Sequence, residues 1–148
     1  MDIVTKACEA LEETLKTIKV DNHYLTNLGD NVIQEFAGIL IANKQQTPFV
    51  AIQPESTGAL QKSTKCSKFE NNLQLVLVVD AFIGASKELN QGLADLRKCL
   101  HHKPFERALG GQIPSLEVGS STYDITDDSR YALAVMPVTL TLIETYED

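Results

Sequence analysis

The sequence predicts an α+β protein with a mixed, mostly antiparallel β-sheet of about five strands and two helices packed on one face. Three observations lead to this fold class. Two stretches have apolar residues at three- and four-residue steps, several others have strand-like composition, and the order along the chain is helix, strands, helix, strands. Because 148 residues suit a single core, residues 1 to 148 are expected to form one domain.

The first helix is predicted close to the N-terminus, with Asp2 as its N-cap. Glutamate and lysine residues separate the apolar positions, which favours a helix with one buried stripe. The helix is expected to end near Asp21 and Asn22, two residues typical of turns. The apolar positions are Ile3, Val4, Ala7, Leu11, Leu15 and Ile18.

Two short apolar runs follow. The run "VIQEFAGILIA" fits a strand or a short buried helix, and its β-branched content favours the strand. The run "PFVAIQP" is predicted to be a short strand, because Pro48 and Pro54 suit a strand end or a sheet edge.

Residues 54 to 68 are mostly small and polar, with one glycine and three lysines. Their composition buries little apolar surface, so we expect a long, mobile connection that a neighbouring molecule orders. Thr57, Lys62, Lys65 and Lys68 are its candidate interface residues.

A central strand and a second helix are predicted next. Leu73, Leu75, Leu77 and Val79 alternate with residues of a second, partly apolar face. The second helix is expected to start at Ser86 as its cap and to end before Pro104. Its buried positions are Leu89, Leu93, Leu96 and Leu100.

The remainder holds "SLEVGSSTYDI", a turn at "TDDS" and a long closing strand, "RYALAVMPVTLTLIETY". Both faces of this closing strand carry many apolar residues, and so long an apolar surface needs cover. We therefore expect self-association.

The net charge of -7 argues against sequence-specific DNA binding, which requires a basic face. The acidity belongs to the C-terminal part, because residues 115 to 148 carry seven acidic groups and only Arg130 as a base. The three cysteines form no C-x-x-C pair, which favours free thiols in a reducing compartment. The sequence shows no pattern of a signal peptide or a membrane-spanning segment, so we expect a soluble protein that is not exported.

Candidate chemical sites are few, and each has a simpler interpretation. Cys99, His101 and His102 form a C-x-H-H cluster, but adjacent histidines on a helix point in different directions and no fourth ligand lies nearby. Asp124, Asp127 and Asp128 suit a solvated turn better than a metal site.

Other motifs lead to the same result. The segment "LGGQIP" lacks phosphate-loop spacing, and the lysines of residues 62 to 68 lack interleaved aromatic residues. Met136 and Phe105 are predicted to lie in the core or an interface. We expect no enzyme activity, no cofactor and no metal.

The order and spacing of these elements resemble the tail terminator family of long-tailed bacteriophages, also known as minor tail protein U or neck and tail completion proteins. The resemblance covers essentially the full length. It depends on the apolar stripe of the first helix, the stretch Y-L-T-x-x-G-x-x-V from Tyr24 to Val32, "PFVAIQPE", "LNQGLADLRKCL" and the closing strand. The chain differs in having "NHY" where an Asn-Gly-Tyr turn is expected.

The resemblance implies a hexameric ring that caps the tail tube, stops its polymerisation and joins the tail to the head connector. The implied partners are further copies of the chain, the tail tube protein, the connector or neck protein, and the sheath if the tail is contractile. The implied location is the virion tail or neck, after synthesis in the bacterial host cytoplasm. Genomic DNA would only pass through, and no membrane is involved.

Within this interpretation, residues 21 to 32 are a structural link in which Asn22 makes the turn, Tyr24 and Leu25 pack, and Gly29 allows a close approach or a positive φ. Glu117, Asp124, Asp127 and Asp128 are candidate lumen-facing residues, because acidic groups repel passing phosphates. Two alternatives remain open: another phage ring component, such as a tube or connector subunit, and a small α+β enzyme or ligand-binding domain.

Overall fold

The computed structural model describes residues 2 to 102 and 115 to 146 of the chain. Within these ranges the fold is α+β, with three α-helices, two 3-10 turns and a mixed six-stranded sheet. The elements are α1 (Ile3–Leu15), η1 (Val20–Asn22), η2 (Leu28–Asp30), β1 (Val32–Ile33), α2 (Ala37–Ala42), β2 (Phe49–Lys62), β3 (Cys66–Asp80), α3 (Ala85–His102), β4 (Ser115–Val118), β5 (Thr122–Ile125) and β6 (Tyr131–Thr145).

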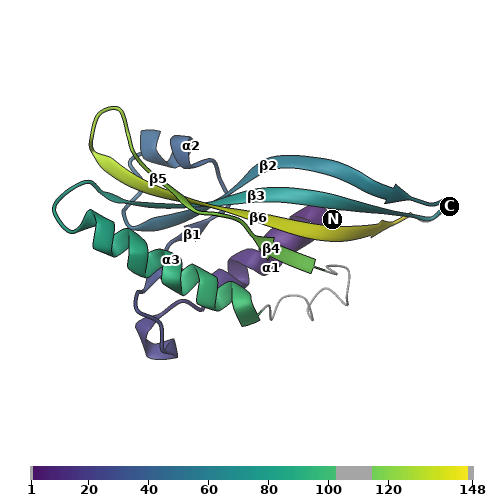
Figure 1. Cartoon of the computed structure of the whole chain (residues 1–148), viewed down its shortest axis with the longest axis horizontal. Coiled ribbons are helices and arrows are strands. Elements are labelled where there is room, and N and C mark those ends of the chain that lie inside the picture. Colours follow the sequence, from purple (N-terminus) through teal and green to yellow (C-terminus); the bar gives the residue numbers. More distant parts are fainter. Residues whose placement is uncertain (1, 103–114, 147–148) are drawn as a thin grey trace.

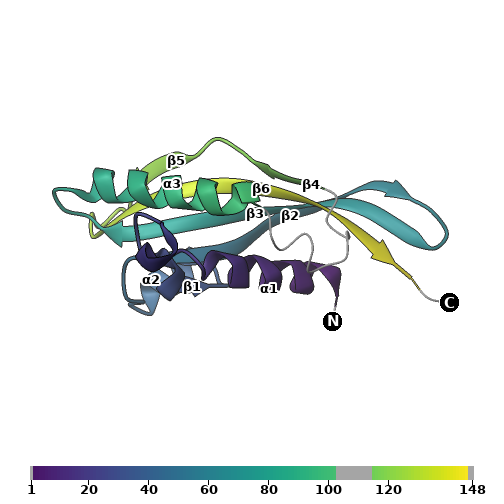
Figure 2. The ribbon, with the colours of Figure 1, turned by 90° about the horizontal axis from the view of Figure 1, so that it is seen from below.

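The sheet has the order β1-β2-β3-β6-β4, and β5 also pairs with β6. Only the short β1 to β2 pairing is parallel, so the prediction of a mixed, mostly antiparallel sheet is confirmed. Helices α1 and α3 cover one face of the sheet, as expected (Figure 1, Figure 2). The expected count was too low, because α2 is a third helix and packs on the opposite face.

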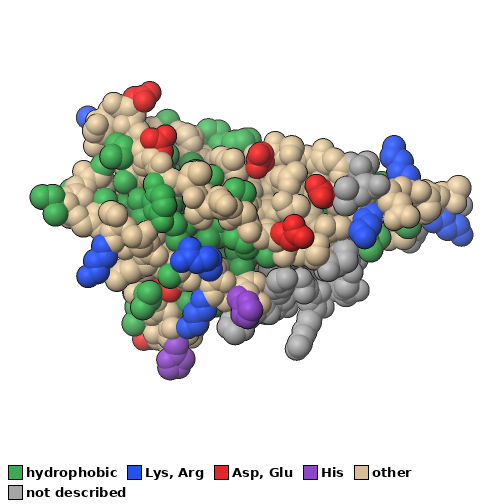
Figure 3. Space-filling model, viewed as in Figure 1, with side chains coloured by type: hydrophobic (Ala, Val, Ile, Leu, Met, Phe, Trp, Pro, Cys, Tyr) green, Lys and Arg blue, Asp and Glu red, His purple; other side chains and the backbone are tan. Residues whose placement is uncertain are grey.

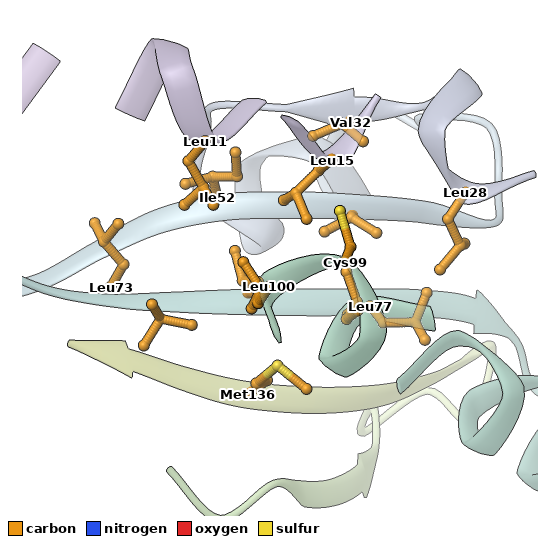
Figure 4. Packing of buried hydrophobic residues seen from close by; sticks show 14 of the residues in the cluster. Leu11, Leu15, Leu28, Val32, Ile52, Leu73, Leu77, Cys99, Leu100 and Met136 are labelled. Atoms are coloured by element: carbon orange, nitrogen blue, oxygen red, sulfur yellow. The ribbon is translucent and has the colours of Figure 1, made fainter. Parts of the chain in front are cut away.

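The main core lies between the sheet and the two long helices (Figure 4). Alternate residues of β3 and β6 point into it, including Leu75, Leu77 and Met136, which are fully buried. The helices contribute Leu11 and Leu96, so the predicted stripes of both helices face the sheet. The interpretation of Met136 as a core residue is confirmed.

Helix α1 begins at its predicted cap, where the Thr5 backbone N–H donates to Asp2 Oδ1 over 2.9 Å. The helix ends at Leu15, well over one turn earlier than expected. Two hydroxyl groups compete with the backbone there, because Thr14 Oγ1 donates to the Ala10 carbonyl and Thr17 Oγ1 to the Thr14 carbonyl. Helix α3 starts at Ala85, so the predicted cap Ser86 lies inside its first turn.

The second face of the sheet has an apolar half and a polar half. In the apolar half, Ala37 and Leu40 of α2 pack on Phe49, Val76 and Val78. The preference for a strand over residues 32 to 42 was therefore mostly wrong, because only Val32–Ile33 is extended. The apolar second face of the closing strand is partly covered within one subunit, since Leu133 and Val135 pack against this cluster and are half-buried.

The polar half continues along the same face toward the β2–β3 turn. Its side chains bond across strands: Gln53 donates to Gln74, and Thr139 donates to Asn72, which donates to Ser56. These neutral pairs satisfy each other while remaining open to water, so this half of the sheet needs no apolar cover.

Residues 54 to 68 form a β-hairpin rather than the predicted mobile connection. Strand β2 pairs with β3 as far as Lys62, and three residues close the turn. Register shifts at Pro54/Ser56 and Ala59/Gln61 interrupt the alternation of side chains. Pro54 is tolerated inside β2 because β1 pairs only with Val50 and Ala51, so β2 is an edge strand beyond that point.

Strands β4 and β5 lie on the same edge of β6 and are separated by residues 119 to 121. Pro137 of β6 faces this break, and its carbonyl accepts the Gly119 backbone N–H over 2.8 Å. Because proline has no N–H, an unbroken partner strand would leave an unpaired carbonyl there. The break between β4 and β5 therefore occurs where β6 has no backbone N–H to donate.

Candidate functional site

The molecule is elongated, and its two ends differ in charge and shape. Strand β3 runs from one end to the other, and 15 strand residues correspond to about 45–50 Å. At one end, β2, β3 and the end of β6 continue as a three-stranded arm, residues 54–73 and 138–145, whose base packs against α1 and whose tip extends past both long helices (Figure 1, Figure 2). At the other end lie the β3–α3 loop and the β5–β6 turn, which we call the loop end, residues 80–88 and 126–130.

The arm carries all four residues predicted as an interface loop, and all four are exposed. Thr57 and Lys62 lie on β2, Lys68 lies on β3, and Lys65 lies in the turn. The turn is held by Ser63, whose backbone N–H donates to the Cys66 carbonyl, and by the Tyr146 N–H, which donates to the Lys65 carbonyl. Figure 3 shows the basic groups at this end.

A small cavity of about 220 Å³ lies close to the arm's tip. Ile143 supplies an apolar wall, and Lys62 and Lys68 bring positive charge to its rim. Gln61, Ser63 and Cys66 complete the lining. Small-molecule sites usually measure roughly 300–1,000 Å³, so this cavity suits a side chain better than a substrate.

The loop end exposes two large apolar side chains. Phe82 is 64% exposed and Ile83 is fully exposed. The loop is tight, because the Ala85 N–H donates to the Phe82 carbonyl and Gly84 has a φ of 103°, a conformation that favours glycine. The chain therefore enters α3 with Ile83 directed away from the core. Sequence patterns gave no signal for this, because "DAFIGAS" also suits the end of a buried strand.

The four predicted acidic residues are exposed but do not form a cluster. Glu117 lies on β4 and Asp124 on β5, where they pair with Thr139 and Leu133 of β6. Those partners are six strand positions apart, or about 20 Å. Asp127 lies in the β5–β6 turn beyond them. The acidic groups thus follow one edge of the sheet toward the loop end.

Asp128 orders its own turn. Its Oδ1 accepts hydrogen bonds from Thr126 Oγ1 at 2.6 Å and from the Arg130 backbone N–H at 3.1 Å. The Thr126 hydroxyl, followed by the Arg130 N–H, lowers the pKa of this carboxyl below its ordinary value. In the described parts of the chain, no group of three His, Cys, Asp or Glu side chains could hold a metal ion.

The predicted C-x-H-H motif is not assembled into a site. Cys99 is buried, and its Sγ donates to the Thr14 carbonyl over 3.4 Å. Burial raises the pKa of this thiol. His101 is exposed on the same helix, and the side chain of His102 lies outside the described residues, as do "LGGQIP" and Phe105.

The link of residues 21 to 32 is held by contacts to α1 and α3. Asp95, only 2% exposed, accepts the backbone N–H groups of Leu25 and Thr26 at 3.0 and 2.8 Å and the Thr26 hydroxyl at 2.6 Å. Lys98 Nζ donates to the His23 carbonyl over 2.6 Å. Sequence reasoning missed Asp95, because a carboxylate between leucines on a helix is typical of an exposed face.

The specific expectations for this link had mixed outcomes. The side-chain amide of Asn22 donates to the Thr17 carbonyl, which confirms its role in the turn. Tyr24 packs against the core, with the Lys98 ammonium 4.7 Å from its ring centre, and burial is the main cause that raises its pKa to about 12. Leu25 does not pack and is 62% exposed. At Gly29 the link passes close to the backbone of Lys16 and Ile18, as expected.

A second cavity, of about 340 Å³, lies beneath this link and is lined by Asp30, Asn31, Gln46, Thr47 and Glu88 among others. Burial, and then the charge of Asp80, raise the pKa of Glu88. Asp30 pairs with Lys19 at 3.6 Å. Of the described residues that line this cavity, none is a histidine or cysteine that could act with Glu88.

The sequence matches no family model and no curated protein. Across the described residues, no helix has the length and apolar character needed to cross a membrane.

Proposed function

We propose that the protein is a structural subunit that assembles head to tail into a closed ring, and that this ring is the hexameric terminator of a bacteriophage tail tube. The two unlike ends of the elongated sheet carry the proposal. A ring closes through heterologous contacts, which require two different surfaces on each subunit. The arm offers lysines and a small cavity, and the loop end offers exposed apolar side chains and carboxylates.

The resemblance in the order of elements supplies the biological part of the proposal. In it, the ring caps the tail tube, stops tube polymerisation and joins the tail to the head connector or neck protein. The sheath would be a further partner in a contractile tail. The protein would be made in the host cytoplasm and would act in the virion tail or neck, without catalysis or a cofactor.

The acidic edge fits a passage for DNA. Glu117, Asp124, Asp127 and Asp128 are exposed along the side formed by β4, β5 and their turn. If this side faces the lumen, six copies would repeat the charges around the channel and repel the phosphates of moving DNA. Salt would screen this field beyond about 8 Å, so the effect is local to a narrow channel.

We expect the free protein to be a monomer or weak oligomer and to form a six-membered ring on isolated tail tubes. Growth control requires that the ring forms only on a finished tip. Mass photometry with and without tubes, together with negative-stain images, measures this. A stable dimer in both conditions would contradict the proposal, and long tubes of the protein alone would identify a tube subunit.

Changing Asp124, Asp127 and Asp128 together to lysine should slow genome ejection, because a basic lumen attracts phosphate. Asp128 orders its turn, so a companion variant keeps it and changes Glu117, Asp124 and Asp127 to lysine. Ejection from virions in low salt is the measurement.

The matched control changes Glu9, Glu13 and Asp21 to lysine, which alters the net charge equally on exposed positions away from this edge. Ring assembly and circular dichroism should be unchanged in all three variants. Ejection at the normal rate in both lumen variants would show that the acidic edge does not line the channel.

A further inference from the structure

The geometry points to one contact between neighbouring copies: the Ile83 side chain of one subunit enters the arm cavity of the next. Lys62 and Lys68, which line the cavity, then meet Asp80 and Glu88, which precede and follow the loop that carries Ile83. This inference rests on the proposed ring and deepens it by naming the two surfaces. It commits to a second copy of this chain as the occupant.

Shape is the first argument. The arm cavity of about 220 Å³ exceeds the roughly 150 Å³ that suffices to hold a benzene molecule in an apolar protein cavity, so one isoleucine side chain fits. Its apolar wall is Ile143. Ile83 is fully exposed, and the turn at Gly84 holds it outward without any cover from its own subunit.

Charge is the second argument. The arm tip carries Lys62, Lys65 and Lys68, all exposed. Around Ile83, Asp80 is exposed at the end of β3 and is oriented by Thr47, whose Oγ1 donates to Asp80 Oδ1 over 2.7 Å. Glu88 follows in the first turn of α3.

Lys87 is the opposing cation of that turn, so the loop from Asp80 to Glu88 has a net charge of -1. The arm tip, residues 62–68 and 143–146, has a net charge of +2, because Glu144 opposes its three lysines. Such charges fix orientation and speed encounter, and the apolar insertion supplies affinity.

Placement is the third argument. The two surfaces lie at opposite ends of the long axis, separated by the whole of β3 (Figure 1). A subunit therefore cannot fill its own cavity. Each copy can donate Ile83 to one neighbour and accept the Ile83 of another, which is the heterologous pattern that closes a ring.

The chain supplies its own reporter, because Cys66 lines the arm cavity. In the variant Ile83→Cys, oxidation should join residue 83 of one copy to Cys66 of the next. At high protein concentration, non-reducing gels should then show a ladder above the dimer, and mass spectrometry of the linked peptides should identify the 83–66 pair. The double variant Ile83→Cys with Cys66→Ser should give no such ladder.

A matched control places the new thiol on another exposed apolar position, Leu25→Cys, which should not link to Cys66. Conversely, Ile83→Asp should weaken ring formation on tubes at least about tenfold while leaving the circular dichroism spectrum unchanged, because the lost insertion is apolar. The charge reversal Lys62→Glu with Lys68→Glu should also weaken it, and Asp80→Lys should partly restore it.

The outcomes separate this contact from the proposed function. Rings that form on tubes but never give the 83–66 link would overturn the contact and leave the ring function standing. A clear 83–66 ladder in a protein that does not bind tubes would support the contact and overturn the terminator function. If Ile83→Asp assembles as well as the wild type, the contact is wrong.

Discussion

Replacing Asp95 with asparagine is expected to lower the free energy of unfolding by about 3 kcal/mol. The two carboxylate oxygens accept the N–H groups of Leu25 and Thr26 and the hydroxyl of Thr26. Asparagine has nearly the same shape, but one oxygen becomes an NH₂ group that cannot accept a hydrogen bond. A donor would then face a donor in a site where Asp95 is only 2% exposed.

Urea unfolding followed by circular dichroism measures this change through the transition midpoint. Asp21→Asn is the matched control, because Asp21 is exposed and the same chemical change should leave its midpoint nearly unaltered. Amide exchange at Leu25 should also become faster in Asp95→Asn. The remaining oxygen favours the position of Oδ2, where it keeps the two donors of Thr26, so the Leu25 N–H loses its acceptor. An unchanged midpoint would mean that Asp95 does not hold the link.

Gly29→Ala is expected to be at least as damaging, with a loss of about 3 kcal/mol or more. A Cβ atom at position 29 would lie 2.3 Å from the Lys16 carbonyl oxygen and 2.8 Å from that of Ile18. Both are backbone atoms, so no side-chain rotation relieves the overlap. The link would have to move away from the end of α1 and lose the 2.8 Å hydrogen bond from Gly29 N–H to Ile18.

Gly38→Ala is the control for this prediction. Gly38 lies in α2, and a Cβ atom there would meet nothing within 4 Å. Alanine favours a helix over glycine by roughly 0.5–1 kcal/mol, so this variant should unfold at an equal or higher urea concentration than the wild type. A Gly29→Ala protein that unfolds at the same urea concentration as Gly38→Ala would contradict the close approach at Gly29.

Regular apolar spacing explains which elements could be predicted. The stripe of α1 with its Asp2 cap, the leucines of α3 and the alternation of β3 and β6 all reflect one dominant buried face. Helix α2 was missed because its apolar run is too short for periodicity to separate helix from strand. The arm was missed because its strands pair polar side chains in the open and because two register shifts disrupt their alternation.

The candidate site was predicted less completely. Lys62, Lys65 and Lys68 were selected by composition, and the structure gathers them at one tip. The acidic residues were selected by charge, and the structure distributes them along an edge. The pairing of Ile83 with the arm cavity could not be predicted, because it depends on how far β3 separates the two ends of the molecule. No local sequence pattern contains that information.

The pairing of β3 with β6 has a consequence for how the chain reaches this fold. Cys66 pairs with Thr145 and Asp80 with Tyr131, so the paired positions are 79 and 51 residues apart in sequence. The β2–β3 hairpin needs only a three-residue turn, and α3 follows β3 directly. Local elements of this kind form before distant strand pairs, whose loop closure is slow. We therefore expect β3 to keep one edge unpaired during synthesis until β6 has been made.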